Sequence, residues 1–281
     1  MKKLVINQNN VSEIAEKELG KLCPFDAIEY SGGTVEVNSA CKMCGLCVKN
    51  GPKGLFEIVE ITSDHDYDHA NNHDHWHAEP VNKSDWKGIA VYIDQVEGAI
   101  HPVSFELLGK ARELAEKVDA SVYALCAGYG IGKIADQVLQ YGADEVFVYD
   151  QPELEHFRIE PYTAVFEDFI NEVKPSVCLV GGTTTGRSLA PRTAARFRTG
   201  LTADCTRLDI KPNTDLDQIR PAFGGNIMAH IHTPAHRPQF ATVRYKIFSA
   251  PEKQPSVSVT GSVKNRTLSV EKLASRIKVL N

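Results

Sequence analysis

From residue 86 onward, short apolar runs alternate with longer segments whose apolar residues recur at helical spacing. The short runs predict strands at residues 88–93, 121–126, 145–149 and 176–180. The longer segments predict helices over 102–118, over a stretch that ends at 140, and over 162–173 and 186–198. Four successive strand–helix units favour an α/β fold with a doubly wound parallel sheet. In such sheets, ligands bind beyond the carboxyl ends of the strands.

The pattern changes on either side of this region. After Leu201 the chain predicts shorter strands separated by turns, at 206–210, 218–221, 227–231 and 239–243. Before the region of alternating strands and helices, residues 62–85 hold half of the ten histidines, several aspartates and almost no aliphatic side chains. That composition is typical of a solvated linker, so we expect separately folded parts before and after it.

Composition and charge exclude several classes. With 281 residues and 42% hydrophobic residues the chain can bury a sizeable core, and its length suggests about two domains. The formal net charge of -5 supplies no basic field, so we expect no nucleic-acid partner. No apolar run approaches the roughly 20 residues of a membrane span, and the N-terminal residues do not resemble a secretory signal. We therefore expect a cytoplasmic protein.

The seven cysteines are unevenly distributed. Cys126, Cys178 and Cys205 are scattered, and we interpret them as small buried hydrophobic residues. The other four lie near the N-terminus, at Cys23, Cys41, Cys44 and Cys47. Three of these form a C-x2-C-x2-C run, and Cys23 is followed by a proline. This arrangement resembles the repeated unit of bacterial two-cluster ferredoxins, C-x2-C-x2-C-x3-C-P, whose fourth cysteine ligates the other cluster.

Counting within that unit predicts a single cluster. If Cys23 is the fourth cysteine of the first unit, positions 13, 16 and 19 should hold the other three, and none is a cysteine. If Cys47 is the third cysteine of the second unit, its fourth would stand at Gly51. One cluster has thus lost all its ligands and the other has kept all four. We predict one [4Fe–4S] cluster on Cys23, Cys41, Cys44 and Cys47; a structural zinc site or an empty relic are the alternatives.

Histidines offer two further metal hypotheses, both weaker. The linker stretch alternates Asp with His65, His69, His73, His75 and His77, ligands that suit zinc, nickel or copper, but nothing there fixes them in place. His230 and His232 alternate on an expected strand near His236, without an evident fourth ligand. We therefore favour a linker in the first case and ordinary side chains in the second.

Two glycine turns follow predicted strands. The turn at Gly128, Gly130 and Gly132 lacks dinucleotide-binding spacing, and a plain strand–helix turn accounts for it. The turn at 181–188, GGTTTGRS, contains Thr185, Gly186 and Arg187 at an expected helix start. Backbone N–H groups there can face an anion, whereas a cation is disfavoured by the helix dipole. We interpret Arg187 as a functional residue, with an ordinary surface arginine as the alternative.

Four longer stretches of the sequence are more informative than these single motifs. They read VYIDQVEGAIHPVSFELLGKARELA, VLQYGADEVFVYD, KPSVCLVGGTTTGRSLAPRTAARFRTGLTADCTRLDI and IRPAFGGNIMAHIHTPAHRPQFATVR. Together they resemble the N-terminal domain of electron transfer flavoprotein alpha subunits. Residues 1–61 resemble the ferredoxin-like extension of some alpha subunits from anaerobic, electron-bifurcating systems.

The resemblance implies a domain order. We expect a small α+β ferredoxin-like domain at 1–61, a linker at 62–85, the α/β domain at 86–260, and the start of a connection to a C-terminal FAD domain at 261–281. That FAD domain is not in this sequence, so the chain is either a fragment or has lost that flavin site.

The resemblance also implies partners and cofactors. The partners are a beta subunit, an FAD-dependent dehydrogenase and ferredoxin, and electrons pass through FAD and the cluster. Arg187, with Gly186 and Thr185, matches the position that lies near the beta-subunit flavin in bifurcating relatives. Two other interpretations remain open. One is an α/β nucleotide-binding module with a structural iron–sulfur cluster, and the other is a metal-storage protein built around the His/Asp stretch.

Overall fold

The chain divides into two compact units, Met1–Trp76 and His77–Asn281. The computed structural model describes residues 2–8, 11, 22–31, 33–38, 40–60, 81–255 and 260–279. Each unit is described by itself. The division falls within the stretch expected to be a linker, and residues 62–80 of that stretch lie outside the described residues.

In the residues that the structure describes, the N-terminal unit contains two small antiparallel pairs of strands and one short helix. Strand β1 (Lys2–Ile6) pairs with β4 (Phe56–Glu60), and β2 (Ile28–Ser31) pairs with β3 (Thr34–Val37). Helix α2 (Leu46–Asn50) precedes β4. A small apolar core holds these elements together, and it consists of Val11, Ile28, Val35, Leu55 and Phe56. The α+β character expected for this region is present in the described residues.

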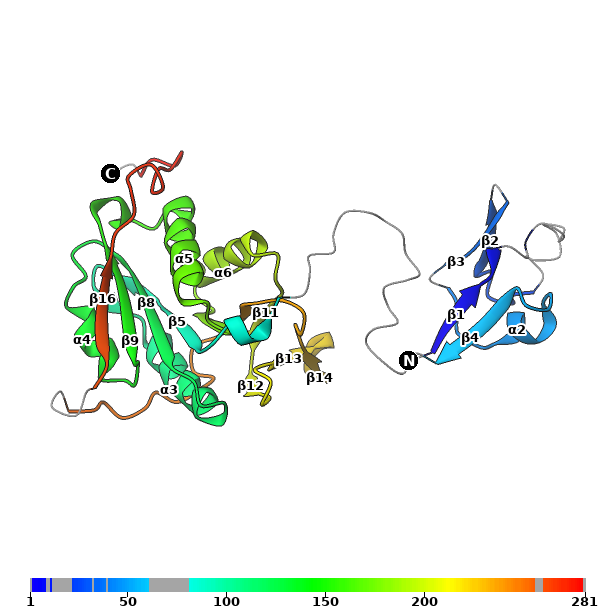
Figure 1. The fold of residues 1–281 in the computed structure, drawn as a ribbon, viewed down its shortest axis with the longest axis horizontal. Coiled ribbons are helices and arrows are strands. Elements are labelled where there is room, and N and C mark those ends of the chain that lie inside the picture. Colours follow the sequence, from blue (N-terminus) through cyan, green and yellow to red (C-terminus); the bar gives the residue numbers. More distant parts are fainter. Residues whose placement is uncertain are drawn as a thin grey trace. The chain divides into compact units, whose positions relative to one another are not determined.

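The second unit is organised by a seven-stranded sheet in the order β11-β15-β10-β5-β8-β9-β16, in which every neighbouring pair is parallel (Figure 1). The strands are β5 (Ile89–Ile93), β8 (Val122–Gly128), β9 (Glu145–Asp150), β10 (Val177–Gly181), β11 (Leu201–Cys205), β15 (Gln239–Val243) and β16 (Ser262–Arg266). The central strands are buried along their whole length, as near-continuous apolar runs require in a sheet covered on both faces.

Helices cover both faces of this sheet. They are α3 (Pro102–Lys117), α4 (Ile134–Leu139), α5 (Ile159–Val173) and α6 (Thr184–Arg196). One apolar core contains residues of α3 and α4, including Leu107 and Val138, while a second contains residues of α5 and α6, including Phe166 and Leu189. Alternate residues of each strand enter the two cores, as in Val91 and Tyr92 of β5. The predicted doubly wound α/β fold is therefore confirmed.

Smaller elements complete the unit. A three-stranded antiparallel sheet contains β12 (Arg207–Ile210), β13 (Leu216–Ala222) and β14 (Ile227–Ile231). Strands β6 (Gln95–Val96) and β7 (Ala99–Ile100) form a hairpin. Short 3-10 turns occur at η2 (Lys83–Asp85), η3 (Pro152–Leu154) and η4 (Phe223–Gly225). The sequence placed β12, β13 and β14 within two residues of their observed bounds.

The described part of 261–281, which was expected to begin a connection, contributes to the folded unit. Strand β16 pairs with β9 along its whole length, so it forms one edge of the main sheet. Leu268 and Leu273 then pack into the core beneath α5 and α6. The pattern did not indicate this strand, because an edge strand with exposed side chains has no apolar periodicity to reveal it.

Candidate functional site

The four N-terminal cysteines come together around one cavity. Cys23 lies before β2, Cys41 and Cys44 lie in the turn that leads to α2, and Cys47 lies in the first turn of α2. Two residues of the turn before α2 adopt the left-handed backbone conformation, Met43 at φ 52° and Gly45 at φ 73°. Such residues reverse the chain direction within few residues, so the chain coils tightly between the cysteines.

The cavity is apolar apart from its sulfur atoms and one lysine. The empty space at this site is about 370 Å³ when the part open to solvent is included. Its wall includes Leu4, Pro24, Phe25, Ala27, Ile28, Val37, Leu46 and Ile58. The backbone N–H of Ala27 donates a hydrogen bond to the Cys23 Sγ atom, at 3.5 Å. Partial burial raises the pKa of the Cys47 thiol, and the neighbouring Cys41 and Cys44 raise it by a smaller amount.

The four thiols can be compared with the ligand sets of single metal ions and of iron–sulfur clusters. Among the described residues, no three His, Cys, Asp or Glu side chains converge closely enough to hold one metal ion. The four thiolates of a cubane cluster bind four different irons at the corners of a cube, so they stand further apart than the ligands of one zinc ion. Four cysteines around one apolar cavity are therefore compatible with a [4Fe–4S] cluster in this unit.

In the second unit, the carboxyl ends of β5 and β10 form the crevice at which the strand order reverses. After β5 the chain adds β8 and β9 on one side, and then returns to place β10 on the other. The cavity at this point is lined by Asp94, Val96, Ala99, His101, Gly182, Thr183, Thr184, Thr185 and Tyr245. Ligands of doubly wound sheets bind at such a reversal.

A threonine fixes the start of α6 in this crevice. The Thr183 hydroxyl accepts a hydrogen bond from the Gly186 N–H at 3.0 Å and donates one to the buried Asp94 carboxylate. Thr183 is thus the N-cap of α6. The helix begins at Thr184, two residues before the start predicted from the sequence. Thr185 lies in the first turn of this helix and lines the crevice.

Arg187 follows in the same turn, and its side chain is 51% exposed. Its Nη2 atom donates to Asp204 Oδ1 at 2.9 Å, while Arg244 Nη2 donates to Asp204 Oδ2 at 2.6 Å. The hydrogen bond from Arg244, and the charge of Arg187, hold the pKa of the Asp204 carboxyl below its usual value although burial opposes this. Two guanidinium groups share one carboxylate, so this group of three side chains carries one excess positive charge.

The sequence singled out Arg187 but missed Asp204 and Arg244. Asp204 stands in β11 with a left-handed backbone (φ 59°), and Arg244 directly follows β15. Both lie where ligand-binding side chains of a parallel sheet are expected, at the carboxyl ends of strands. Recognising Leu201–Cys205 as a strand would have indicated Asp204, and the predicted strand at 239–243 already placed Arg244 at a strand's carboxyl end.

Gly186 is required by the packing of α6 against β10. A Cβ atom at this position would lie 2.0 Å from the Gly181 carbonyl oxygen and 2.9 Å from Val180 Cγ1. Because a backbone atom cannot move aside cheaply, we expect Gly186→Ala to lower the free energy of unfolding by about 1–3 kcal/mol. Urea unfolding followed by circular dichroism measures this effect.

Gly132→Ala is the matched control, since its Cβ would find its nearest neighbour, Asp150 Oδ2, at 3.8 Å. A Gly186→Ala chain as stable as this control would contradict the packing role of Gly186.

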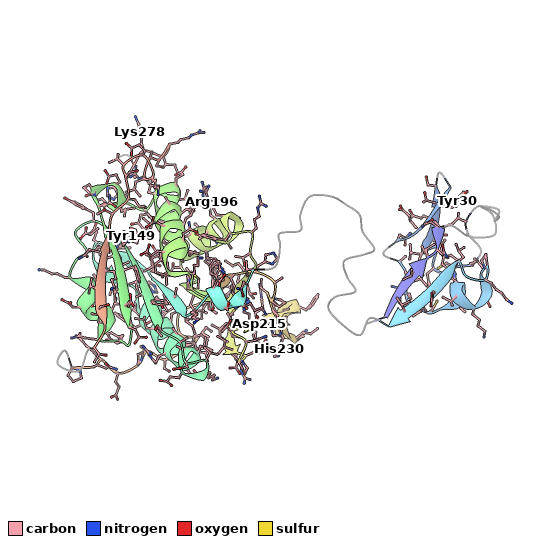
Figure 2. The ribbon with its side chains drawn as sticks, in the orientation of Figure 1. Tyr30, Tyr149, Arg196, Asp215, His230 and Lys278 are labelled. Atoms are coloured by element: carbon pink, nitrogen blue, oxygen red, sulfur yellow. The ribbon has the colours of Figure 1, made fainter. Side chains whose placement is uncertain are left out.

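The remaining candidates are the histidines that the sequence suggested as metal ligands. His230 Nδ1 lies 3.0 Å from Asp217 Oδ2, and His232 Nε2 lies 3.5 Å from Asp217 Oδ1, so the two histidines contact one aspartate (Figure 2 labels His230). No metal-holding group forms there among the described residues. His65, His69, His73, His75 and His77 lie outside the described residues.

Cys126, Cys178 and Cys205 are buried, as predicted. Burial raises the pKa of all three thiols, that of Cys205 to about 12.

The fold is that of a doubly wound α/β domain, and comparison with known proteins identifies its family. The model of the electron transfer flavoprotein domain matches residues 89–270. The chain belongs to this family, and within it resembles the alpha-type subunits. No helix in the part of the chain that the structure describes is long and apolar enough to cross a membrane.

Three relatives illustrate the similarity. "Lactate dehydrogenase (NAD(+),ferredoxin) subunit LctC" of Acetobacterium woodii is 52% identical over 275 residues, which cover 98% of this chain and 62% of that protein. "Electron transfer flavoprotein subunit alpha" of Megasphaera elsdenii is 46% identical over 181 residues, 64% of this chain and 53% of that protein. "Acryloyl-CoA reductase electron transfer subunit beta" of Anaerotignum propionicum is 35% identical over 219 residues, 70% of this chain and 60% of that protein. The chain thus spans a little over half the length of these relatives.

Proposed function

We propose that the chain is an alpha-type electron transfer flavoprotein subunit that carries one [4Fe–4S] cluster on Cys23, Cys41, Cys44 and Cys47. The observation that carries this proposal is the convergence of all four cysteines on one apolar cavity in the N-terminal unit. The similarity to the Acetobacterium woodii protein supports it, because that match covers 98% of the chain and therefore includes this unit.

The chain's own residues would bind and tune the cluster. When bound, such a cluster accepts and releases one electron at a time. The four thiolates would ligate the irons, and the apolar wall would limit the access of water. The Ala27 N–H that points at the Cys23 sulfur would stabilise negative charge there, which raises the reduction potential of a cluster.

The carboxyl edge of the α/β unit is the proposed flavin-facing surface. Arg187, with Gly186 and Thr185 at the start of α6, would face the FAD of a beta subunit. The positive charge left over from the Arg187–Asp204–Arg244 group would favour an anionic form of the flavin.

The proposed partners follow from the family and from the names of the relatives. They are an electron transfer flavoprotein beta subunit, an FAD-dependent dehydrogenase and ferredoxin. The name of the Acetobacterium woodii protein contains both NAD(+) and ferredoxin, which supports a place in flavin-based electron bifurcation. The proposed location is the cytoplasm.

Counting iron and sulfide in the anaerobically reconstituted chain tests this proposal, together with EPR before and after dithionite. We expect about four irons per chain and a signal that appears on reduction. Zinc in place of iron, or a cluster that dithionite cannot reduce, would overturn the electron-transfer role of the N-terminal unit.

One observation favours a second candidate, an α/β nucleotide-binding module with a structural cluster. The crevice at the strand-order reversal combines a buried carboxylate, hydroxyl groups and the Tyr245 ring, which suits a nucleotide. Under this alternative, the reduced cluster would pass no electrons to the flavin of a beta subunit. Mixing the chain that carries the reduced cluster with the beta subunit, and following flavin absorbance, distinguishes the two candidate functions.

Arg187→Gln tests the flavin-facing surface. Removing one half-exposed positive charge near a flavin should lower its midpoint potential by about 40 mV, or about 1 kcal/mol for one electron. The measurement is a redox titration of the complex with the beta subunit.

Arg196→Gln serves as the control, because Arg196 lies at the other end of α6 and is exposed to a similar degree (Figure 2). Equal potentials for wild type and Arg187→Gln would refute a role for Arg187 near the flavin.

A further inference from the structure

A buried carboxylate of the α/β unit accepts hydrogen bonds from the backbone of a distant loop. Glu106 lies on α3 and is 6% exposed, although glutamates are almost never buried unless they are paired. Both of its carboxylate oxygens accept from the backbone N–H of Lys246, at 3.1 and 3.0 Å. An apolar side chain would pack α3 against the sheet equally well, so packing alone does not explain the carboxylate.

The N–H that Glu106 binds belongs to an unfavourable turn. Lys246 has a left-handed backbone conformation (φ 68°), which residues other than glycine adopt rarely. This residue ends the short segment that leaves β15 at its carboxyl end. Glu106 therefore stabilises a backbone conformation that a lysine does not favour by itself.

The same segment carries two side chains of the carboxyl edge. Arg244 Nη2 donates to Asp204 Oδ2 at 2.6 Å, although the arginine side chain is 62% exposed. Tyr245 is 45% exposed and lines the crevice at the strand-order reversal, where its ring stands edge-on to His101. Packing encloses neither side chain, so the backbone of the segment determines where both of them lie.

This backbone is anchored at both ends. At the end next to β15, the Gly182 N–H donates to the Val243 carbonyl oxygen at 2.6 Å. At the other end, Glu106 holds the N–H of Lys246. The arginine and the tyrosine are the two residues between these anchors, so the loss of either anchor would release them.

We propose that Glu106 is a positioning residue of the flavin-facing surface, where it holds Arg244 against Asp204 through the backbone of Lys246. This inference rests on the proposed function, because that surface is the one proposed to face the flavin of a beta subunit. Glu106 itself is buried beneath the loop and acts through Arg244.

The test compares two variants that remove the same charge. In Glu106→Gln the amide oxygen can still accept from the Lys246 N–H, whereas Glu106→Met fills a similar volume and offers no oxygen. The readout is the carboxyl pKa of Asp204, measured by NMR titration of the full chain, because the hydrogen bond from Arg244 is the main influence that lowers it. We expect Glu106→Met to shift this pKa upward and Glu106→Gln to leave it near the wild-type value.

The sign of the shift separates position from charge. The loss of a nearby negative charge would lower the pKa of Asp204, so an upward shift in Glu106→Met cannot come from the charge removed. Arg244→Gln supplies the upward shift expected when the hydrogen bond is lost completely. Glu116→Ala is the matched control, since Glu116 is an exposed glutamate of the same helix, and it should leave the pKa unchanged.

Hydrogen exchange of the wild-type chain needs no variant. The Lys246 amide should exchange slowly, because it is held by a buried carboxylate. Exchange as fast as that of a solvent-exposed amide would overturn the inference. So would equal Asp204 pKa values in the wild type and Glu106→Met, provided that Arg244→Gln raises the pKa.

The complex with the beta subunit provides a second readout. The midpoint potential of the flavin should be lower in Glu106→Met than in Glu106→Gln, a change in the same direction as that expected for Arg187→Gln. If Arg187→Gln lowers the potential and the two Glu106 variants have equal potentials, the positioning role is overturned and the proposed function stands. If Arg187→Gln has no effect, the flavin-facing surface is overturned, and the role of Glu106 there with it.

Discussion

Replacing Asp215 with alanine should lower the free energy of unfolding of the α/β unit by about 3–5 kcal/mol. The Asp215 carboxylate accepts hydrogen bonds from Arg237 Nη2 at 2.7 Å and from Lys83 Nζ at 2.8 Å. The Arg237 side chain is fully buried, and its Nε atom has no hydrogen-bond partner among the residues that the structure describes. Without Asp215 the guanidinium would be a buried charge without a counterion. Removing one partner of a buried ion pair destabilises the fold strongly, because the other charge stays buried and uncompensated.

A matched control separates burial from charge. Lys117 and Asp209 form an equally short ion pair, 2.8 Å, but both side chains are more than 40% exposed. Asp209→Ala should therefore cost below about 1 kcal/mol. Arg237→Met added to Asp215→Ala should recover part of the lost stability, because it removes the unpaired charge. Urea unfolding of the four chains measures this, and equal costs for Asp215→Ala and Asp209→Ala would contradict the argument.

The same carboxylate predicts a dependence on pH. Burial alone would raise the pKa of Asp215, but the hydrogen bonds from Lys83 and Arg237 outweigh it and hold the pKa below its ordinary value of 3.8. A carboxyl whose pKa is lower in the folded state stabilises the fold above its unfolded pKa. That stability is lost as the pH falls through the folded pKa. The Asp215→Asn chain should therefore lose less stability between pH 5 and strongly acidic solution than the wild type.

The sequence predicted the elements of the sheet better than its edges. Apolar runs such as Ile89–Ile93 identify buried strands directly, and the helix expected over 102–118 matches α3. Leu201–Cys205 was not expected as a strand, because the sequence LTADC mixes polar and apolar residues and its pairing partner, β15, lies almost 40 residues further on. Long-range pairing of this kind leaves no local signal.

The candidate sites differ in the same way, because one follows from a local pattern and the other from long-range strand pairing. The spacing of Cys41, Cys44 and Cys47 is a local pattern, so it could be recognised from the sequence alone. The Arg187–Asp204–Arg244 group could not, because its members are separated by 17 and 40 residues and meet only through the order of the strands. Arg237 is a further case, since arginines are mostly exposed and no pattern in the sequence indicates its burial.

Cys23→Ala should abolish the four-iron form of the proposed cluster. Cys23 is the one cysteine of the four that lies outside the C-x2-C-x2-C run, and it lines the cavity from the segment before β2. Without it, one corner of the cluster would lack a protein ligand and would be open to solvent. Iron should fall below about four per chain, and the EPR signal of the reduced cluster should be lost.

The unit should also lose stability, because a cluster held by all four cysteines ties the segment at Cys23 to the turn at 41–47. Binding that is restricted to the folded state stabilises that state, so the loaded wild-type unit should resist urea better than the variant. Cys126→Ala is the control: it removes a buried thiol of the α/β unit and should leave iron and EPR unchanged. If the Cys23→Ala chain instead keeps four irons and an unaltered signal, the fourth ligand is another residue, and the count that pairs Cys23 with the C-x2-C-x2-C run is wrong.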